Sequence, residues 1–178
     1  MKLTQRLALT LVALILPLSV SGQGSSPSVT VAPIGTVLVA RGGKAPLRLN
    51  LQVNRGFHVN SNKPHDELLM PTAVHLNPPD GIVIMNIQYP AGDELALPFM
   101  GNEKLSVYSG EFTVTAEVRV PKSAALGTLR VHGDVKYQAC DNRQCFPPKT
   151  APLEFDVKVV RPKVKKGSTF TAASPHIH

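Results

Sequence analysis

Hydrophobic and polar residues alternate with a period of two along three stretches of this chain. The apolar positions are Leu47, Leu49, Leu51 and Val53; Phe112, Val114, Ala116, Val118 and Val120; and Leu153, Phe155, Val157 and Val159. Successive side chains of a strand point to opposite faces, so this period is typical of strands with one buried face. The pattern therefore predicts three amphipathic strands.

Further strands are expected where the alternation is less regular, at residues 36–40, 72–76, 82–89 and 129–139. The 16 prolines and 13 glycines interrupt the chain too often for helices of ordinary length, and no convincing helical stripe occurs after the N-terminal segment. Seven or eight short strands with frequent turns predict an all-β fold, an immunoglobulin-like antiparallel β-sandwich. The chain has no Trp and its two cysteines are near neighbours, so the inter-sheet pin of antibody domains is absent.

The N-terminal segment has the features of a secretory signal peptide. Lys2 and Arg6 supply positive charge, the run from Leu7 to Val20 is apolar and uncharged, and small residues surround its end. That run is shorter than the roughly 20 residues of a membrane-spanning helix. We therefore expect residues 1–22 to be a signal peptide and the protein to be exported. An uncleaved membrane anchor is the alternative.

Residues 23–160 are expected to form one domain, long enough to bury a core without disulfides. Residues 161–178 lose the alternation and gain basic and small polar residues, which predicts a basic disordered tail. Six of the 19 basic residues lie in the leader and the tail, so the domain itself holds 13 basic against 12 acidic residues. A basic binding surface needs its charge on the folded part, and we therefore expect no nucleic-acid partner.

The two cysteines, Cys140 and Cys145, lie in the segment YQACDNRQCFPP. If the strand at 129–139 is regular to its end, Tyr137 is on its apolar face and Cys140 continues its polar face. The alternation thus predicts that Cys140 points away from the core. Residues i and i+5 lie opposite each other when a four-residue loop joins two strands, and directly opposed residues are close enough for a disulfide. The spacing therefore permits a disulfide across the loop.

Local features leave two interpretations of the pair open. A disulfide that closes a ring of about six residues stabilises a protein by only roughly 2 kcal/mol on the loop-entropy estimate. Arg143 and Lys149 near an accessible hairpin tip favour a thiolate, whereas Asp141 opposes it. Pro147 and Pro148 stiffen the chain after the second cysteine. These points favour a pair that exchanges disulfides, and the alternative is a structural disulfide in an exported adhesive or carbohydrate-binding module.

Three segments resemble the N-terminal periplasmic domain of the thiol:disulfide interchange protein DsbD. YQACDNRQCFPP is similar to the aromatic-Gln-small-Cys stretch of that family, with its short loop, second cysteine, aromatic residue and two prolines. GFHVNSNKP at 56–64, followed by residues 68–72, resembles the glycine-aromatic-histidine segment and the later Pro-Thr step. PFMG at 98–101, with Tyr108 beyond it, resembles the loop that caps the cysteines. The resemblance covers most of residues 29–159.

The resemblance implies an immunoglobulin-like domain that relays electrons in the periplasm. In this family the second cysteine forms the mixed disulfide with a partner and the first cysteine resolves it, which assigns these roles to Cys145 and Cys140. An aromatic residue of the cap shields the pair, and Phe99 is the candidate. The other residues that the resemblance places around the site are Tyr137, Phe146 and Tyr108.

The resemblance also implies the partners. A thioredoxin-like or membrane thiol donor protein would supply electrons, and oxidised periplasmic proteins would be the substrates. No small-molecule cofactor is expected, because the cysteines carry two electrons themselves, and we expect a monomer. If the pair is redox-active, the activity is that of a protein-disulfide reductase-type thiol:disulfide oxidoreductase.

The sequence departs from the family in two respects. The membrane electron-conducting segment and the thioredoxin-like domain of the full-length relative do not occur in it, so we expect a standalone exported protein whose electron donor is another polypeptide. The acidic pair directly before the cap aromatic is also absent. Ala96, Leu97 and Pro98 occupy that stretch, with Asp93 and Glu94 further away.

The histidines do not suggest a metal site. His58 lies inside a strand-like segment and is expected to be structural, while His65, His75 and His132 are expected at the surface. A blue-copper site needs two histidines, a cysteine and usually an axial methionine. No histidine follows Cys145 until the tail. We therefore expect no metal.

Overall fold

The computed structural model describes residues 28–98, 101 and 103–163, and these residues form an all-β fold without an α-helix. Over these ranges the chain has no helix that is long and apolar enough to span a membrane. The predicted signal peptide, and all but the first three residues of the predicted tail, lie outside the described residues. Those two predictions therefore remain predictions.

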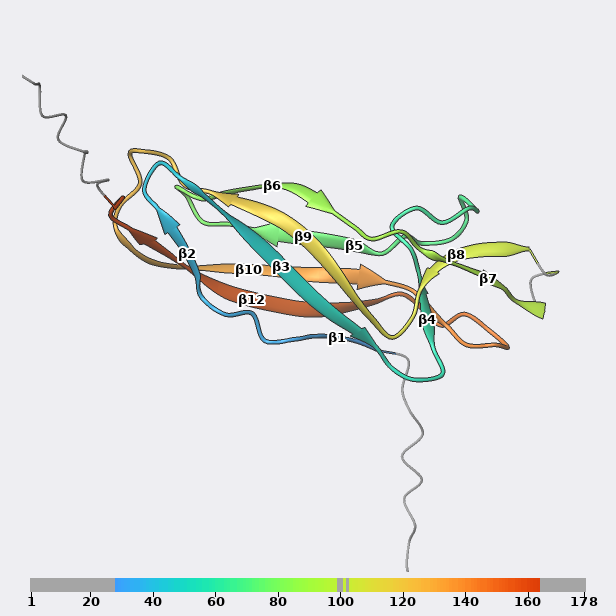
Figure 1. Cartoon of the computed structure of the whole chain (residues 1–178). Coiled ribbons are helices and arrows are strands. Elements are labelled where there is room, and N and C mark those ends of the chain that lie inside the picture. The colour runs from blue at the N-terminus through green and yellow to red at the C-terminus, as the bar shows by residue number, and fades with distance from the viewer. Residues whose placement is uncertain (1–27, 99–100, 102, 164–178) are drawn as a thin grey trace, which may run out of the picture.

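Two four-stranded sheets pack face to face as a β-sandwich (Figure 1). The strands of the first sheet, in spatial order, are β1 (Val29–Val31), β3 (Lys44–Val53), β9 (Glu111–Arg119) and β6 (Val83–Gln88). Those of the second are β2 (Val37–Ala40), β12 (Lys149–Val160), β10 (Gly127–Tyr137) and β5 (Ala73–Asn77). All pairs in these sheets are antiparallel except β2 with β12. The predicted immunoglobulin-like sandwich is confirmed, with one parallel pair at an edge.

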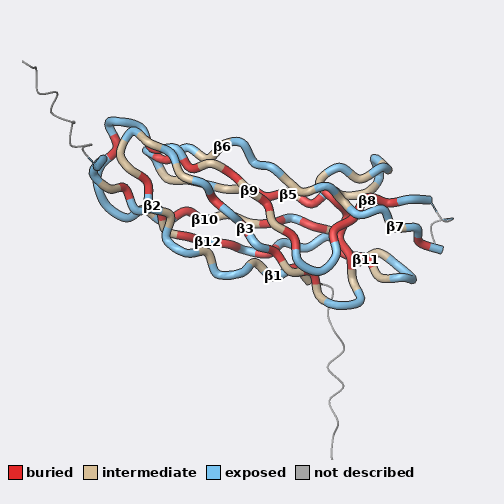
Figure 2. Tube along the Cα trace, in the orientation of Figure 1, coloured by how far each residue is buried: buried red, intermediate tan, exposed pale blue. Residues whose placement is uncertain are grey.

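The predicted alternation explains the packing of the two sheets. The three amphipathic stretches correspond to β3, β9 and β12, and each of their predicted apolar residues is buried. Figure 2 shows buried positions alternating with exposed or half-buried ones along these strands. Buried side chains from both sheets form one cluster, here called the main core. Burial of apolar area at about 25 cal/mol per Å² makes this cluster the chief source of stability.

A third, smaller sheet lies at one end of the sandwich and is called the tip sheet here (Figure 1). Its strands, in order, are β11 (Ala139–Cys140), β4 (His58–Asn60), β8 (Lys104–Tyr108) and β7 (Asp93–Ala96). The sequence did not predict β7 or β8, and it indicated β4 only as a strand-like segment around His58. Both β4 and β8 are short, and they bury the polar residues His58, Asn60 and Ser106, which alternation would assign to an exposed face. Leu97, Leu105 and Val107 form a separate small cluster there.

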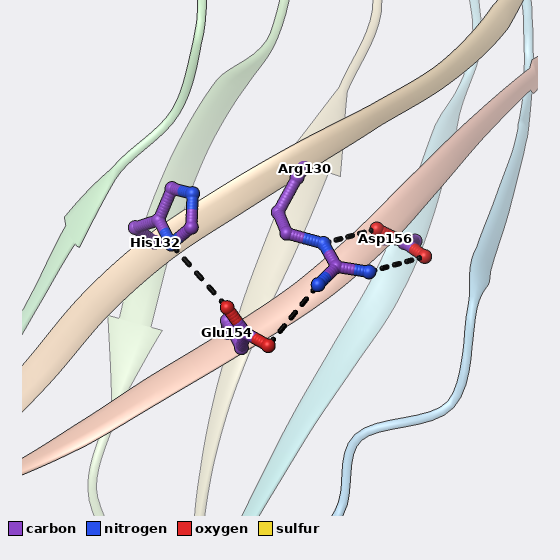
Figure 3. Close-up of polar contacts among 4 residues, drawn as sticks. All are labelled: Arg130, His132, Glu154 and Asp156. Carbon is purple, nitrogen blue, oxygen red and sulfur yellow. Dashed lines mark hydrogen bonds and ion pairs between the residues drawn. The ribbon is translucent and has the colours of Figure 1, made fainter.

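The outer face of β10 and β12 carries a network of charged side chains (Figure 3). The Arg130 guanidinium donates to Asp156 at 2.9 Å and to Glu154 at 3.1 Å. His132 Nδ1 lies 3.5 Å from the second carboxylate oxygen of Glu154. Exposed pairs of this kind contribute little to stability. The histidines predicted at the surface are all exposed in the structure: His65, His75 and His132.

Candidate functional site

The cysteine pair lies where the chain leaves the sandwich for the tip sheet. β10 ends at Tyr137, Gln138 is outside any strand, and β11 then pairs antiparallel with β4. In this pairing Cys140 is directly opposite His58. Figure 2 shows the buried trace at β11 giving way to half-buried and exposed positions in the following loop. The first cysteine is therefore at the base of a projecting loop.

The prediction that Cys140 points away from the core holds for the main core, which includes Tyr137 and Ala139 and not Cys140. Its face is not open, however, because Cys140 is 0% exposed. β10 ends at Tyr137 and the chain passes into the tip sheet, where Cys140 is buried as well. The expectation that Cys140 is not on a buried side was one reason to favour exchange over a structural disulfide. The burial of Cys140 removes that reason.

Cys140 and Cys145 form a disulfide with an S–S distance of 2.03 Å and a Cα–Cα distance of 3.9 Å. They are paired as an antiparallel bridge, so the prediction that they lie opposite each other across a four-residue loop is confirmed. Asp141 Oδ1 accepts the backbone N–H groups of Arg143 at 2.7 Å and Gln144 at 2.8 Å. These hydrogen bonds, that from Arg143 first, lower the pKa of the Asp141 carboxyl. The loop thus holds its own shape with an ionised Asp141.

The two sulfurs differ in their access to a partner. Cys140 is fully buried, whereas Cys145 is only half-buried and is preceded by three exposed loop residues. A thiolate must approach the sulfur that it attacks along the disulfide, so access decides which sulfur reacts. The structure leaves Cys145 as the more accessible of the two.

Gln138 joins the cysteine loop to the rest of the tip. Its Nε2 donates to the carbonyl of Phe146 at 3.3 Å, while its Oε1 accepts from Asn60 Nδ2 and the Met70 N–H, both at 3.4 Å. The Phe146 N–H donates to the carbonyl of Ala139 at 2.8 Å. The Gln138 side chain therefore connects Phe146, at the far end of the cysteine loop, to Asn60 of β4 and to Met70, which precedes β5.

The aromatic residues predicted around the site have different positions. Phe146 packs edge-on against Phe57, with ring centroids 5.7 Å apart and an interplanar angle of 71°. Tyr137 is buried in the main core at the end of β10. Phe99, the predicted shield, lies outside the described residues. Phe57 was not singled out from the sequence, although it stands in the GFHVN segment.

Tyr108 lies on the side of β4 away from β11, where it pairs with Val59. Its ring stacks on Phe112 with centroids 4.4 Å apart, and its hydroxyl donates to Asn62 Oδ1 at 2.6 Å. Burial raises the pKa of this hydroxyl. Tyr108 therefore connects the tip sheet to the main core, and its role at the cysteine pair stays a prediction.

His58 is the residue beside the pair that sequence reasoning treated as structural. It is 4% exposed, and its Nε2 is buried with no hydrogen-bond partner among the described residues. Burial lowers the pKa of the imidazole, and the negative charge of Asp141 acts in the opposite direction. Within the described ranges, no group of three or more His, Cys, Asp or Glu side chains is placed to hold a metal ion.

Fold and site define a class of protein: an immunoglobulin-like sandwich with a disulfide-bonded cysteine pair in a hairpin at one end. The family described as thiol:disulfide interchange protein DsbD, N-terminal, matches residues 29–156, and the chain belongs to it. DsbD N-terminal domains are periplasmic and interact with thiol-redox partners. The family and the bonded pair fit a thiol–disulfide exchange domain.

Several solved structures are similar to this chain. The N-terminal periplasmic domain of ScsB from Proteus mirabilis is 14% identical with a TM-score of 0.47, over 72% of this chain and 44% of that chain. This chain thus spans less than half the length of the ScsB chain. The seventh ScaB type I cohesin from Pseudobacteroides cellulosolvens is 12% identical with a TM-score of 0.43, over 84% of this chain and 97% of that chain. Among curated proteins the sequence has no significant match.

Proposed function

We propose that the protein is a periplasmic relay that passes electrons between protein partners through Cys140 and Cys145. The observation that carries the proposal is the bonded pair at the tip, with one cysteine buried and the other half-buried. This asymmetry suits a reaction in which partners form a mixed disulfide with Cys145 and the buried Cys140 resolves it. Membership of the DsbD N-terminal family supports the same conclusion.

In the accepting direction, a thiolate of the donor protein attacks Cys145 Sγ and breaks the disulfide, so Cys140 leaves as a thiolate. The second thiol of the donor then attacks the donor's sulfur in the mixed disulfide. This releases Cys145 as a thiolate and leaves the donor oxidised. Two electrons have moved to the cysteine pair. In the donating direction, Cys145 attacks the disulfide of a substrate and Cys140 resolves the mixed disulfide.

The proposed donor is a thioredoxin-like or membrane thiol protein, and the proposed acceptors are oxidised periplasmic proteins. Phe57 and Phe146 form an aromatic pair next to the accessible sulfur, and aromatic residues are enriched where proteins meet. Phe99, Tyr137, Phe146 and Tyr108 are proposed as the residues that shield and pack the site, with Phe99 as the cap.

The reduction potential of the Cys140–Cys145 pair tests the proposal. It is measured by equilibration in glutathione buffers, thiol trapping and mass spectrometry. A value above about −250 mV is expected, because exchanging disulfides have higher potentials than structural ones. A value below about −300 mV would mark a bond that cellular thiols leave closed, and the relay would be rejected.

Two matched variants test the roles of the cysteines. Cys140→Ser leaves Cys145 without its resolving partner, so a stable mixed disulfide with a reactive dithiol protein is expected on a non-reducing gel. Cys145→Ser leaves only the buried sulfur and is expected to trap little. Equal trapping by both variants would contradict the assigned order.

The alternative is an exported binding module in which the disulfide is a brace, and the full burial of Cys140 favours it. Replacing both cysteines by Ser separates the two functions. A relay loses exchange and keeps most of its stability, whereas a braced module loses stability first.

A further inference from the structure

His58, Cys140 and Cys145 form a row across the tip. Cys140 is the antiparallel partner of His58 on one side and of Cys145 on the other. Directly opposed residues of antiparallel strands have their side chains on the same face, with Cβ atoms about 4.5–5.5 Å apart. The imidazole therefore lies on the same face as the buried sulfur and beside it.

The imidazole has hydrogen-bonding capacity that the oxidised tip does not use. Burying an unpaired polar group is costly, so native proteins rarely keep such groups. Nε2 of His58 is nonetheless buried without a partner in the described part of the chain. A disulfide sulfur has no proton to donate. A reduced Cys140 has an S–H group at this place in the row.

The charges around His58 favour a proton transfer there. Asp141, in the cysteine loop, is the charged group that acts on the imidazole, and its own pKa is lowered by two backbone hydrogen bonds. Tyr108 of β8 pairs with Val59, so it lies on the other face of β4 from His58, and its hydroxyl donates to Asn62. Burial keeps His58 neutral while the pair is oxidised, and an imidazolium formed later has the Asp141 carboxylate to balance it.

We propose that His58 takes the proton from the Cys140 thiol and returns it, so that the buried cysteine can resolve mixed disulfides. When Cys140 resolves, its proton moves to the imidazole and the thiolate attacks Cys145 Sγ. The new Cys140–Cys145 bond forms, the bond to the partner breaks, and the partner leaves as a thiolate with both electrons. In the reverse reaction the neutral imidazole takes up a proton from the solvent as the Cys140 thiolate forms, and passes it to that sulfur. This inference rests on the proposed function and adds the residue that moves its proton.

Titration of a single-cysteine form tests the coupling without any exchange partner. Cys145→Ala leaves Cys140 reduced, and the ultraviolet absorbance of its thiolate is followed against pH. Adding His58→Gln keeps a side chain of similar size that cannot take a proton, so the midpoint should rise by about one pH unit. His132→Gln, an exposed histidine on β10, is the matched control and should not shift it. Equal midpoints for all three proteins would overturn the proposal.

If His58→Gln does not fold, the same coupling is tested on the unsubstituted protein by NMR. The NMR titration of the His58 ring is recorded before and after reduction of the disulfide. A neighbouring thiolate stabilises the imidazolium, so the midpoint should move upward by about one pH unit on reduction. An unchanged midpoint would overturn the proposal. Neither result depends on the reduction potential, so loss of the relay would not by itself remove the coupling.

Discussion

The sandwich and the tip of this protein are stabilised in different ways. In the sandwich, β10 pairs with β12 along its whole length and apolar side chains from two sheets form the main core. At the tip, β11 pairs with β4 over two residues, and the loop that follows is held by Asp141, the Gln138 side chain and one disulfide. Apolar burial dominates the sandwich, whereas polar contacts and the disulfide hold the cysteine loop of the tip.

The difference fits the proposal that the tip carries an exchanging disulfide. Opening a disulfide changes the local chain, and a region whose packing holds up the whole fold would transmit that change. The loop contributes little to the main core, so its bond can break while the sandwich remains folded. Regions of low local stability commonly carry function for this reason.

The largest expected effect comes from the sandwich. Leu49→Ala removes a side chain that is 0% exposed at the centre of β3, and should lower the free energy of unfolding by about 3 kcal/mol through lost burial and a cavity. Urea denaturation measures it. Leu68→Ala is the matched control, since Leu68 is 93% exposed, and should change stability by less than about 0.5 kcal/mol. Equal losses for the two variants would contradict the assignment of the core.

Opening the disulfide should cost less. Replacing Cys140 and Cys145 by Ser should lower the free energy of unfolding by about 2 kcal/mol, because the bond closes a short loop. Urea denaturation of the unsubstituted protein with and without dithiothreitol provides the control. A loss above that of Leu49→Ala would mean that the disulfide braces the whole domain, which supports the binding-module alternative.

Removing the side chain that connects the loop should have a smaller effect still. Gln138→Ala deletes hydrogen bonds to Phe146, Asn60 and Met70 and should destabilise the protein by about 1 kcal/mol. Hydrogen exchange should show the loss at the tip and not in β12. Gln88→Ala, on the exposed edge strand β6, is the control and should leave exchange unchanged. Uniform faster exchange throughout the domain would contradict a local role.

Acidification should weaken the tip through His58. Burial holds the pKa of the folded imidazole below its usual value of 6.5, so the unfolded chain takes up a proton that the folded chain refuses. The free energy of unfolding should therefore be constant above about pH 6.5 and fall as the pH drops below it. His58→Gln should reduce this slope. The lowered pKa of Asp141 also makes the free energy of unfolding fall with pH, but only near and below its usual pKa of 3.8. Measurements above about pH 5 therefore report on His58.

The smallest effect is expected on the outer face of the sandwich. Arg130→Ala removes the two ion pairs that Arg130 makes in Figure 3, with Asp156 and Glu154, at the solvent-exposed face. The change in unfolding free energy should be within the error of the measurement, and added salt should not alter it. A salt-sensitive loss comparable to that of Gln138→Ala would contradict this.

Sequence patterns were reliable where one face of a strand is buried and the other is exposed. The positions of β3, β9 and β12 and their buried residues follow from alternation alone, and so does the antiparallel pairing of Cys140 with Cys145 from their spacing. Alternation failed at β4 and β8, because those strands are short and bury the polar residues His58, Asn60 and Ser106. It also missed the burial of Cys140, because the strand that leads to it ends at Tyr137 and the chain passes into the tip sheet.

The sequence by itself determined the sandwich, its core and a cysteine pair at the end of a hairpin, since these depend on local periodicity and on spacing within a few residues. Only the tertiary structure decided which sulfur is buried and which residue lies beside it. His58 and Cys140 are far apart along the chain, and they become neighbours because β4 and β11 pair in the tip sheet. Nothing in the sequence of either segment indicates that the two strands will pair.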